Sequence, residues 1–309
     1  MTEPTAPLVI VGTGAMACLF AARLAPHVDV CMLGTWKEGV EALQHSGVEL
    51  IDSDGSLIRH AVRATRDPMQ CVGAGMALVL VKSWQTERAA KQLATCLAPG
   101  GIALTLQNGL GNLEGLQDVL GVERAVLGVT TSGATLLQPG RVRMGGKGLV
   151  QLPSDQRLTL FKALLAQAEF DVQISSDLQG MLWTKLLVNA GINPLTALLD
   201  VPNGALLERP DAMALMMQAA EETAAVAQAC GIQISHENPG ELAAQVAHRT
   251  AENISSMLQD VRRGAPTEID AICGAIVRTG TIVQVEAPVN RTLWHLVQAL
   301  VWQGEGEAS

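Results

Sequence analysis

The chain has 309 residues, of which 48% are hydrophobic and 17% are charged, a balance that excludes a largely disordered protein. Its formal net charge of −9 argues against general binding to nucleic acids or anionic membranes, and the scarcity of aromatic residues removes the usual base-stacking platforms. The six cysteines form no CxxC pair and no cluster with histidine, so they indicate reduced thiols rather than a disulfide frame or a metal site.

The chain is long enough for two domains with separate cores. Its first seven residues are polar and contain no Lys or Arg, unlike the start of a signal peptide. No uninterrupted apolar stretch reaches the roughly 18 residues that a membrane span needs. We therefore expect a cytoplasmic protein without a transmembrane helix.

The first motif is a glycine-rich turn. A β-branched run, Leu8 to Val11, leads directly into this turn, and a helix that ends near Pro26 follows. Strand, glycine turn and helix is the context that a dinucleotide-binding fingerprint requires, with Ala17 in place of the third glycine. The predicted cofactor-binding residues are Gly12, Thr13, Gly14, Ala15 and Met16. The alternative is a merely structural strand–helix turn.

The end of the predicted second strand, Asp29 to Leu33, bears on the choice of cofactor. The acidic residue that would bind a ribose 2′-hydroxyl is missing from the segment 34–37 that follows. Thr35 and Lys37 could bind a 2′-phosphate instead, which weakly favours NADP. Lys37 could equally be the solvent-facing start of the next helix.

Two further strand ends carry polar residues. A buried-type strand at 76–81 ends in Lys82, and another at 102–106 is followed by Gln107 and Asn108. Because ligands bind outside the carboxyl ends of strands in open α/β sheets, Lys82 and Asn108 are candidates for contact with cofactor or substrate. An exposed strand-end lysine and a simple Asn-Gly turn are the alternatives.

The remaining segments of the first half complete a Rossmann-type α/β domain over residues 1–175. An Asp-Gly turn joins a predicted hairpin at 48–51 and 57–64. Strand-like segments at 125–135 and 141–152, and an amphipathic helix at 154–170, follow. Six or more strands alternating with helices favour a doubly wound sheet.

Residues 176–309 predict an all-α domain. Long helical patterns cover residues 211–230, 239–258, 269–283 and 288–302. Ser255 and Ser256 fall inside the second of these, where hydroxyls usually bond back to the helix or face solvent. Thr267 is the expected cap of the next helix, with Glu268 in its first turn.

The segment 183–196 is the most informative part of the second half. It is apolar enough for a buried helix, yet Lys185 and Asn189 lie one turn apart on one face. Asn193 follows them, and Pro194 predicts the helix end there. Three polar groups along one edge of an apolar helix suit a polar ligand. Alternatively, Lys185 reaches solvent and the asparagines satisfy backbone groups.

Taken together, these motifs resemble the ketopantoate reductase (2-dehydropantoate 2-reductase) family. The matching segments run in order through nearly the whole chain: the glycine turn, 82–85, 107–109, 185–195, 201–204, 252–260 and 267–270. The resemblance implies transfer of hydride from a reduced nicotinamide to the ketone carbon of ketopantoate, which yields pantoate for pantothenate and coenzyme A biosynthesis.

The resemblance also implies the roles of individual residues. Lys185 would be the general acid that protonates the carbonyl oxygen, and Glu268 would accept a hydrogen bond from the substrate hydroxyl. Asn189, Asn193 and Ser256 would orient the hydroxyl and carboxylate of the substrate, while Lys82 and Asn108 would hold cofactor and substrate.

One departure from the family pattern concerns the second strand. Similar enzymes usually carry an arginine at its end to bind the 2′-phosphate, and Gly34 stands at that position here. The cofactor is therefore predicted to be NADP, with NAD as an option. A reductase of another 2-oxo acid and a non-catalytic nucleotide-sensing protein remain alternatives. The expected partner is a small 2-oxo acid, and a homodimer is one option for the assembly.

Overall fold

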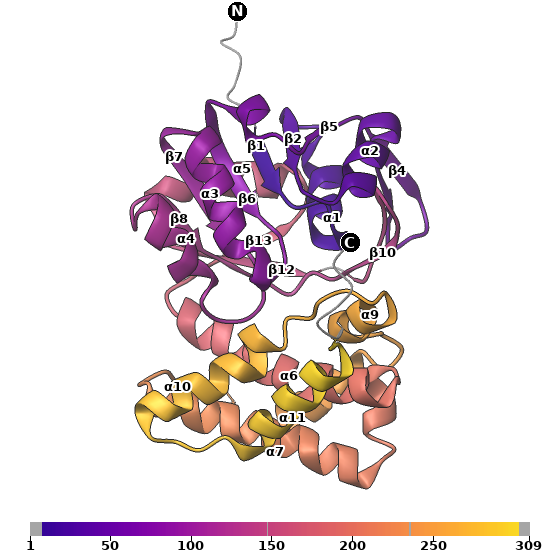
Figure 1. Cartoon of the computed structure of the whole chain (residues 1–309), viewed down its shortest axis with the longest axis vertical. Coiled ribbons are helices and arrows are strands. Elements are labelled where there is room, and N and C mark those ends of the chain that lie inside the picture. Colours follow the sequence, from indigo (N-terminus) through magenta and orange to yellow (C-terminus); the bar gives the residue numbers. More distant parts are fainter. Residues whose placement is uncertain (1–7, 147, 235, 303–309) are drawn as a thin grey trace, which may run out of the picture. The chain divides into compact units, whose positions relative to one another are not determined.

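The protein is described here by a computed structural model that covers residues 8–146, 148–234 and 236–302. The chain divides into two compact units (Figure 1). The first unit comprises Met1–Gln107 and Asn112–Leu178, and the second comprises Asn108–Gly111 and Gln179–Ser309. The chain therefore enters the second unit first for a short segment after Gln107 and again after Leu178.

Six parallel strands form the central sheet of the first unit, in the order β5-β2-β1-β6-β7-β8. These strands are β1 (Leu8–Val11), β2 (Val30–Leu33), β5 (Arg63–Thr65), β6 (Ala74–Val79), β7 (Leu97–Thr105) and β8 (Ala125–Leu127). The strand order reverses between β1 and β6, the switch point at which open α/β sheets bind ligands beyond the carboxyl ends of their strands.

Helices cover both faces of this sheet, because alternate residues of β1 enter two different cores. Leu8 and Ile10 belong to a core that includes Phe20 of α1 and Phe161 of α5, whereas Val9 and its neighbours pack against α3 and α4. The helices of this unit are α1 (Ala15–Leu24), α2 (Lys37–Ser46), α3 (Thr86–Cys96), α4 (Asn112–Leu120) and α5 (Thr159–Gln167).

Two smaller sheets complete the first unit. One contains β3 (Val48–Ile51), β4 (Leu57–His60), β10 (Ala134–Gln138) and β11 (Arg141–Met144), and the other contains β9 (Val129–Thr130), β12 (Leu149–Pro153) and β13 (Asp171–Ser175). The prediction of one strand over 57–64 was wrong: β4 pairs with β3, whereas β5 pairs with β2 in the central sheet. The segments 125–135 and 141–152 are likewise divided among several strands, because each part pairs with a different partner strand.

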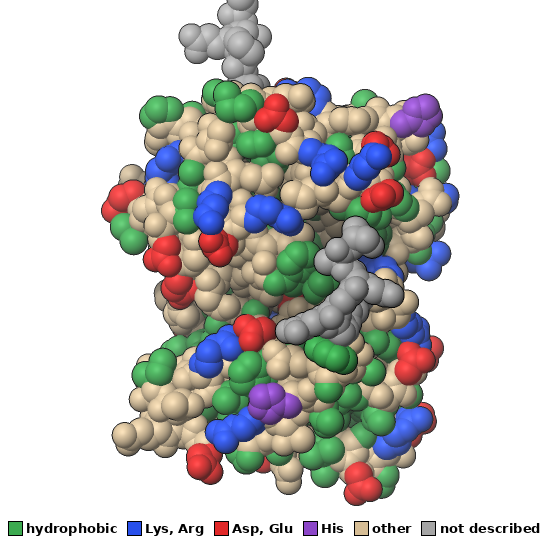
Figure 2. All heavy atoms as spheres, in the orientation of Figure 1, with side chains coloured by type: hydrophobic (Ala, Val, Ile, Leu, Met, Phe, Trp, Pro, Cys, Tyr) green, Lys and Arg blue, Asp and Glu red, His purple; other side chains and the backbone are tan. Residues whose placement is uncertain are grey.

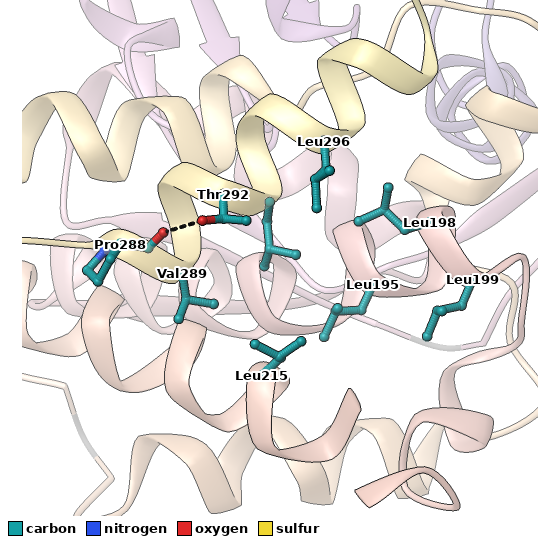
Figure 3. Close-up of a pocket in the computed structure, with 9 residues that line it drawn as sticks. Leu195, Leu198, Leu199, Leu215, Pro288, Val289, Thr292 and Leu296 are labelled. Atoms are coloured by element: carbon teal, nitrogen blue, oxygen red, sulfur yellow. Dashed lines mark hydrogen bonds between the residues drawn. The ribbon is translucent and has the colours of Figure 1, made fainter. Parts of the chain in front are cut away.

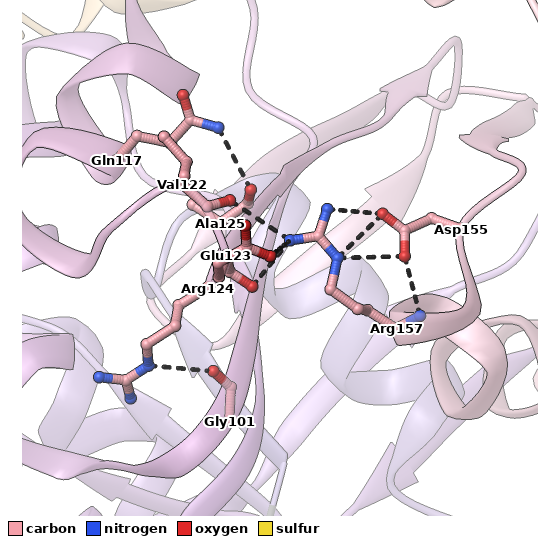
Figure 4. A network of polar contacts seen from close by, with 8 residues as sticks. All are labelled: Gly101, Gln117, Val122, Glu123, Arg124, Ala125, Asp155 and Arg157. Atoms are coloured by element: carbon pink, nitrogen blue, oxygen red, sulfur yellow. Dashed lines mark hydrogen bonds and ion pairs between the residues drawn. The ribbon is translucent and has the colours of Figure 1, made fainter.

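An arginine secures the segment that precedes α5 (Figure 4). Arg157, in the short 3₁₀ helix η3 (Gln156–Leu158), forms an ion pair of 2.6 Å with Asp155. Its guanidinium also donates to the carbonyl oxygens of Val122 and Glu123. This network fixes the entry to α5 against the loop before β8. It is remote in sequence from every candidate site residue.

The second unit is all-helical, and its core contains Leu187, Met216, Ile276 and Val297. Its elements are α6 (Leu178–Leu199), η4 (Asn203–Leu206), α7 (Pro210–Ala229), α8 (Pro239–Arg249), α9 (Ser256–Arg262), η5 (Asp270–Gly274), α10 (Ala275–Val283) and α11 (Pro288–Leu300). The predicted fold class, a Rossmann-type α/β part followed by an all-α part, is confirmed. Among the helices in the described ranges, none has the length and apolarity that a membrane span requires.

The predicted helix end at Asn193 was wrong. α6 continues through Pro194 to Leu199, and Asn193 and Pro194 are both buried. A proline inside a helix removes one backbone donor and crowds the preceding turn. Here the apolar packing of Ile192, Leu195 and Ala197 into the core offsets that cost.

The helix predicted over 239–258 was also wrong, because two helices occupy this region. α8 ends at Arg249, and the connection to α9 bonds to η4 through the amides of Asn203 and Gly204. Ser255 is a buried N-cap whose side chain accepts the Leu258 amide at 3.1 Å. The expectation that Ser255 bonds back within a helix or faces solvent is therefore corrected.

Figure 2 shows that Lys and Arg side chains are interspersed with Asp and Glu over the face drawn there. No continuous basic patch dominates this face, in keeping with the net charge of −9. Of the residues that the structure describes, no group of three or more His, Cys, Asp or Glu is arranged to hold a metal ion.

Candidate functional site

The glycine turn of the first unit has the geometry of an anion site. Gly12 has a φ of +128°, and a Cβ at this position would lie 3.1 Å from the carbonyl oxygen of Leu80, so glycine is required there. A Cβ at Gly14 would meet nothing within 4 Å, which leaves the turn open to a ligand. Gly14 is also the N-cap of α1 and provides no side-chain cap, so the first turn presents backbone N–H groups. This arrangement fits a dinucleotide pyrophosphate.

The other predicted cofactor residues of this turn occupy distinct positions. Ala15 and Met16 are the first two residues of α1 and are half-buried, and Thr13 is buried. A Cβ added at Gly34 would lie 2.6 Å from Cγ2 of Thr13. An arginine at position 34 would therefore require Thr13 to move. The contact between Thr13 and Gly34 was not apparent from the sequence, because the two residues are joined only by the packing of β1 beside β2.

Lys37 is the first residue of α2, directly after the loop that follows β2. Its side chain is 64% exposed and lies 3.8 Å from Glu41, one turn further along the helix. Thr35 is half-buried in the same loop. Both residues thus lie beyond the carboxyl end of β2, where the ribose end of a dinucleotide would be expected.

A buried glutamine joins the ends of the two strands that carry Lys82 and Asn108. Gln107 donates through Nε2 to the carbonyl of Val81 at 3.0 Å and to Oγ1 of Thr86 at 2.9 Å. Its Oε1 accepts the hydroxyl of Thr105 at 2.9 Å. These bonds fix the end of β7 against the end of β6. No role was predicted for Gln107, although a glutamine directly after an apolar strand is a usable signal.

Lys185 and Asn189 lie one turn apart on α6 in the second unit, as predicted, and both are half-buried. Burial lowers the pKa of Lys185 from 10.5 to about 8, and the nearby carboxylate of Glu268 acts in the opposite direction. A lysine with a pKa near neutrality can hold a proton at physiological pH and still release it readily. The second unit therefore contains a lysine of lowered pKa, Lys185, whose charge interacts with the carboxylate of Glu268.

Glu268 is only 5% exposed and precedes η5, rather than lying in the first helical turn as predicted. Its backbone carbonyl accepts the amides of Ala271 and Ile272, both at 3.1 Å. Thr267, the expected cap, accepts only a long 3.5 Å bond from the amide of Ile269. The difference arises because the helix begins with π-helical geometry at Asp270, a form that often occurs at functional sites.

The Asn108–Gly111 segment places Asn108 beside Glu268 within the second unit. Nδ2 of Asn108 lies 3.4 Å from Oε2 of Glu268. The segment is held by the amide of Leu110, which donates to the carbonyl of Ala271 at 3.0 Å. A Cβ at Gly109 would lie 2.6 Å from that same carbonyl oxygen, so the approach requires glycine.

Asn193 and Ser256 are the remaining predicted substrate residues. Asn193 is buried on α6, and Ser256 is the half-buried first residue of α9. Between them runs a hydrogen bond that was not predicted from the sequence: the hydroxyls of Thr196 and Ser255 are bonded to each other at 2.7 Å. This bond joins α6 directly to the N-terminus of α9.

A separate cavity of about 430 Å³ lies elsewhere on the second unit, among α6, α7 and α11 (Figure 3). It contains none of the candidate residues and no charged side chain, so it does not suit a polar 2-oxo acid. Its lining consists of Leu195, Leu198, Leu199, Leu215, Pro288, Val289, Thr292, Leu293 and Leu296.

The candidate residues thus fall into two groups. The first unit contributes the glycine turn, Lys37 and Lys82, and the second contributes Asn108, Lys185, Asn189, Asn193, Ser256 and Glu268. A Rossmann-type unit with an open GxGxxA turn, combined with a helical unit that holds a lysine of lowered pKa beside a buried glutamate, defines a nicotinamide-dependent oxidoreductase.

Comparison with known families makes this class specific. The family model described as "Ketopantoate reductase PanE/ApbA" matches residues 8–156, and the model of its C-terminal part matches residues 177–301. The chain belongs to the ketopantoate reductase family. The resemblance inferred from the sequence motifs is therefore confirmed.

Curated relatives agree with this assignment. The 2-dehydropantoate 2-reductase of Halobacterium salinarum is 35% identical over 297 residues, which cover 94% of this chain and 97% of the relative. The corresponding protein of Escherichia coli O157:H7 is 32% identical over 94% of both chains.

Solved structures show the same fold. A PanE/ApbA family ketopantoate reductase from Ralstonia eutropha JMP134 aligns with a TM-score of 0.87 at 31% identity and covers 95% of this chain and 98% of its own. A D-mandelate dehydrogenase solved with NADH and anilino(oxo)acetate aligns with a TM-score of 0.88 at 24% identity, covering 96% of this chain and 98% of its own. The second similarity bears on the fold alone.

Proposed function

We propose that this chain reduces the ketone of 2-dehydropantoate (ketopantoate) to the alcohol of pantoate, a step in pantothenate and coenzyme A biosynthesis. The observation that carries the proposal is the combination of Lys185, whose pKa burial lowers to about 8, with the buried carboxylate of Glu268, which acts on that pKa in the opposite direction. Relatives named 2-dehydropantoate 2-reductase support the choice of substrate.

Lys185 is the general acid of the proposed reaction. A reduced nicotinamide, when bound, would supply hydride to the ketone carbon, and negative charge would then develop on the carbonyl oxygen. The ammonium of Lys185 stabilises this charge and donates a proton to it. Burial keeps the ammonium poorly hydrated, which makes its proton available near neutral pH.

Glu268 orients the substrate and maintains the charge of Lys185. Its carboxylate accepts a hydrogen bond from the substrate hydroxyl, and its negative charge raises the pKa of Lys185 against the effect of burial. Asn108 lies against Glu268 and contacts substrate and cofactor. The amides of Asn189 and Asn193 and the hydroxyl of Ser256 donate to the substrate's carboxylate and hydroxyl.

NADP is the proposed cofactor. The turn from Gly12 to Met16 would bind the pyrophosphate, and Lys82 would bind a part of the cofactor beyond the pyrophosphate. Thr35 and Lys37 would bind the 2′-phosphate in place of an arginine at position 34, which would require Thr13 to move. NAD is the alternative, because the ion pair of Lys37 with Glu41 weakens its attraction for a phosphate.

The proposed location of the protein is the cytoplasm.

The proposed assembly is a homodimer. Leu199, Leu215 and Leu296 line the leucine-rich cavity and are 40–49% exposed. Obligate homodimer interfaces are apolar, and a two-fold interface brings the same patch of both copies together. Light scattering coupled to size-exclusion chromatography tests this: a dimer that Leu215→Lys converts to a folded monomer supports the proposal, and a monomeric wild-type chain contradicts it.

The function is tested by the oxidation of NADPH and NADH by the purified chain with ketopantoate, followed by the loss of reduced-nicotinamide absorbance. Turnover with NADPH and formation of pantoate support both parts of the proposal. Turnover with NADH alone retains the reaction and overturns the cofactor. Nucleotide binding without turnover overturns ketopantoate as substrate and directs the search to a panel of other 2-oxo acids.

A further inference from the structure

We propose that Thr196 is a positioning residue for the 2-oxo acid: its hydroxyl, through Ser255, holds Ser256 of α9 in register with Asn193 of α6. This inference rests on the proposed function, in which Ser256 and Asn193 orient the substrate. It concerns two buried hydroxyls that have no contact role of their own in that proposal.

Thr196 and Ser255 connect α6 to α9 through side-chain hydrogen bonds. Oγ1 of Thr196 lies 2.7 Å from Oγ of Ser255 and 3.0 Å from the carbonyl oxygens of Ile192 and Asn193. Ser255 in turn accepts the amide of Leu258 as the N-cap of α9. A continuous path of hydrogen bonds therefore runs from the backbone of Asn193 to the first turn of α9.

Each end of this path lies next to a proposed substrate residue. The carbonyl that Thr196 contacts belongs to Asn193 itself, and Ser255 immediately precedes Ser256. Thr196 is fully buried and Ser255 is 6% exposed, so water cannot replace either partner without entering the core. A lost link would displace the two substrate residues relative to each other.

Other contacts do not make this link redundant. The connection before α9 is also held by η4, where the amides of Asn203 and Gly204 donate to the carbonyls of Asn253 and Ala251. The side-chain amide of Asn203 reaches Thr250 at 2.9 Å. These bonds hold the connection up to Asn253, and the side chain of Gln259 bonds to the carbonyl of Ile254 within the same segment. Among the bonds described, the one between Thr196 and Ser255 joins the start of α9 directly to α6.

Thr196 also lies two residues after Pro194 in α6. Pro194 removes one backbone donor from the helix, and the hydroxyl of Thr196 returns toward the carbonyls of the preceding turn. The same side chain therefore contacts both the turn that presents Asn193 and the N-terminus of α9. We expect loss of the Thr196 hydroxyl to misplace the substrate, and enzyme rates are sensitive to such misplacement.

The test compares Thr196→Val, which removes the hydroxyl at nearly constant volume, with Thr196→Ser, which keeps it. Thr196→Val is expected to raise KM for the oxo acid roughly tenfold, as loss of a buried hydrogen bond allows, with KM for the cofactor within about twofold. Thr196→Ser is expected to restore KM for the oxo acid.

Thr223→Val is the matched control. Thr223 is a fully buried threonine of the same unit, and its hydroxyl bonds at 2.7 Å to the carbonyl of Ala219 one turn back in its own helix. Its loss is expected to change stability without a selective change in KM for the oxo acid. If Thr196→Val does not fold, Ser255→Ala is compared with the hydroxyl-retaining Ser255→Thr; Ser255→Ala also removes the cap bond to the Leu258 amide, so Ser255→Thr must restore KM for the oxo acid.

The outcomes separate the inference from the function on which it rests. Wild-type turnover is measured first; no turnover with ketopantoate or any other 2-oxo acid overturns the proposed function and this inference together. Turnover by the wild type with an unchanged KM for the oxo acid in Thr196→Val, or an equal change in Thr223→Val, overturns the inference alone. Non-additive effects of Thr196→Val and Ser255→Ala on that KM support a shared bond.

Discussion

The two units place their candidate ligand groups by different physical means. In the first unit the groups are largely backbone: Gly12 needs its positive φ, Gly14 leaves space, and the N–H groups of α1 face the opening. In the second unit they are side chains: burial and the charge of Glu268 act on the pKa of Lys185, and Glu268 is itself buried. A backbone site tolerates sequence change in its surroundings, whereas a side-chain site requires particular residues at particular positions.

This difference explains the specificity of the two kinds of motif. The glycine turn is shared by many dinucleotide-binding proteins, so on its own it indicates only a class of ligand. The segments around Lys185, Ser256 and Glu268 carry the chemistry, and they are the ones that resemble a single family. Substitutions in the first unit should therefore affect cofactor binding, whereas substitutions in the second unit should affect turnover of the oxo acid.

The largest effect is expected from Lys185→Ala. Removal of the proposed proton donor should lower kcat for ketopantoate reduction by roughly 10²–10⁴-fold, the usual contribution of a general acid. Cofactor affinity should be unchanged, because the glycine turn is intact. Steady-state kinetics and fluorescence titration with NADPH measure the two quantities.

The same variant distinguishes the reductase from a nucleotide-sensing protein. A sensor has no use for a proton donor and would bind nucleotide as before, with no turnover in the wild type to lose. Retention of wild-type kcat by Lys185→Ala would contradict the role of Lys185 and direct attention to another acid near Glu268.

Gly14→Ala should produce the complementary failure in the first unit. The added methyl meets no protein atom within 4 Å, so the melting temperature should fall by only a few degrees, as expected for a change at an N-cap. The methyl would instead occupy the space through which the pyrophosphate approaches, and loss of charged hydrogen bonds should raise KM for the cofactor by about 10- to 100-fold.

Gly133→Ala is the control, because a Cβ there also meets nothing and its φ is not positive. It should change neither KM nor melting temperature. A Gly14→Ala enzyme with normal cofactor KM would show that the opening above Gly14 is not where the pyrophosphate binds.

The contrast between the units also describes what could be predicted from the sequence. The central strands and the glycine turn follow from local signals, since apolar runs and glycines report backbone requirements directly. Lys185 and Asn189 share a face of α6 as their spacing predicts. These features depend on residues close together in the chain.

Features that depend on distant residues could not be predicted. Pro194 was expected to end a helix, but the core of the second unit favours its continuation. Ser255 was predicted to lie inside a helix because the residues that bond to it and to the preceding connection, Thr196 and η4, are about fifty or more residues away in the chain. The contact of Thr13 with Gly34 and the π-helical start after Glu268 likewise arise from tertiary packing.

The pH dependence of turnover tests the coupling of charges in the second unit. Because Lys185 must be protonated and its pKa is about 8, kcat/KM for ketopantoate should fall as pH rises through about 8. Glu268→Gln removes the charge that raises this pKa, so the basic limb should move to lower pH, with a roughly tenfold lower kcat/KM from the weaker substrate bond. Rate profiles at saturating cofactor measure both.

Glu241→Gln is the control for this shift, because Glu241 is an exposed carboxylate in the first turn of α8. It should leave the basic limb unchanged. A basic limb that is identical in wild type and Glu268→Gln would contradict the coupling.

The lowered pKa of Lys185 also affects stability. Between about pH 8 and 10.5 the unfolded chain holds the Lys185 proton more tightly than the folded chain does. The contribution of Lys185 to the free energy of unfolding therefore rises with pH in this range.

The smallest effect is expected from Lys37→Ala, which tests the cofactor choice in the first unit. An exposed lysine contributes little to binding a phosphate in water, so KM for NADPH should rise by only about threefold to fivefold, and KM for NADH should not change. Lys91→Ala is closely matched, since Lys91 is 66% exposed and also pairs with a glutamate one helical turn away. Equal sensitivity of both nucleotides to Lys37→Ala would mean that Lys37 does not contact the 2′-phosphate. The difference between NADP and NAD would then rest on Thr35 and on the closed packing of Gly34 against Thr13.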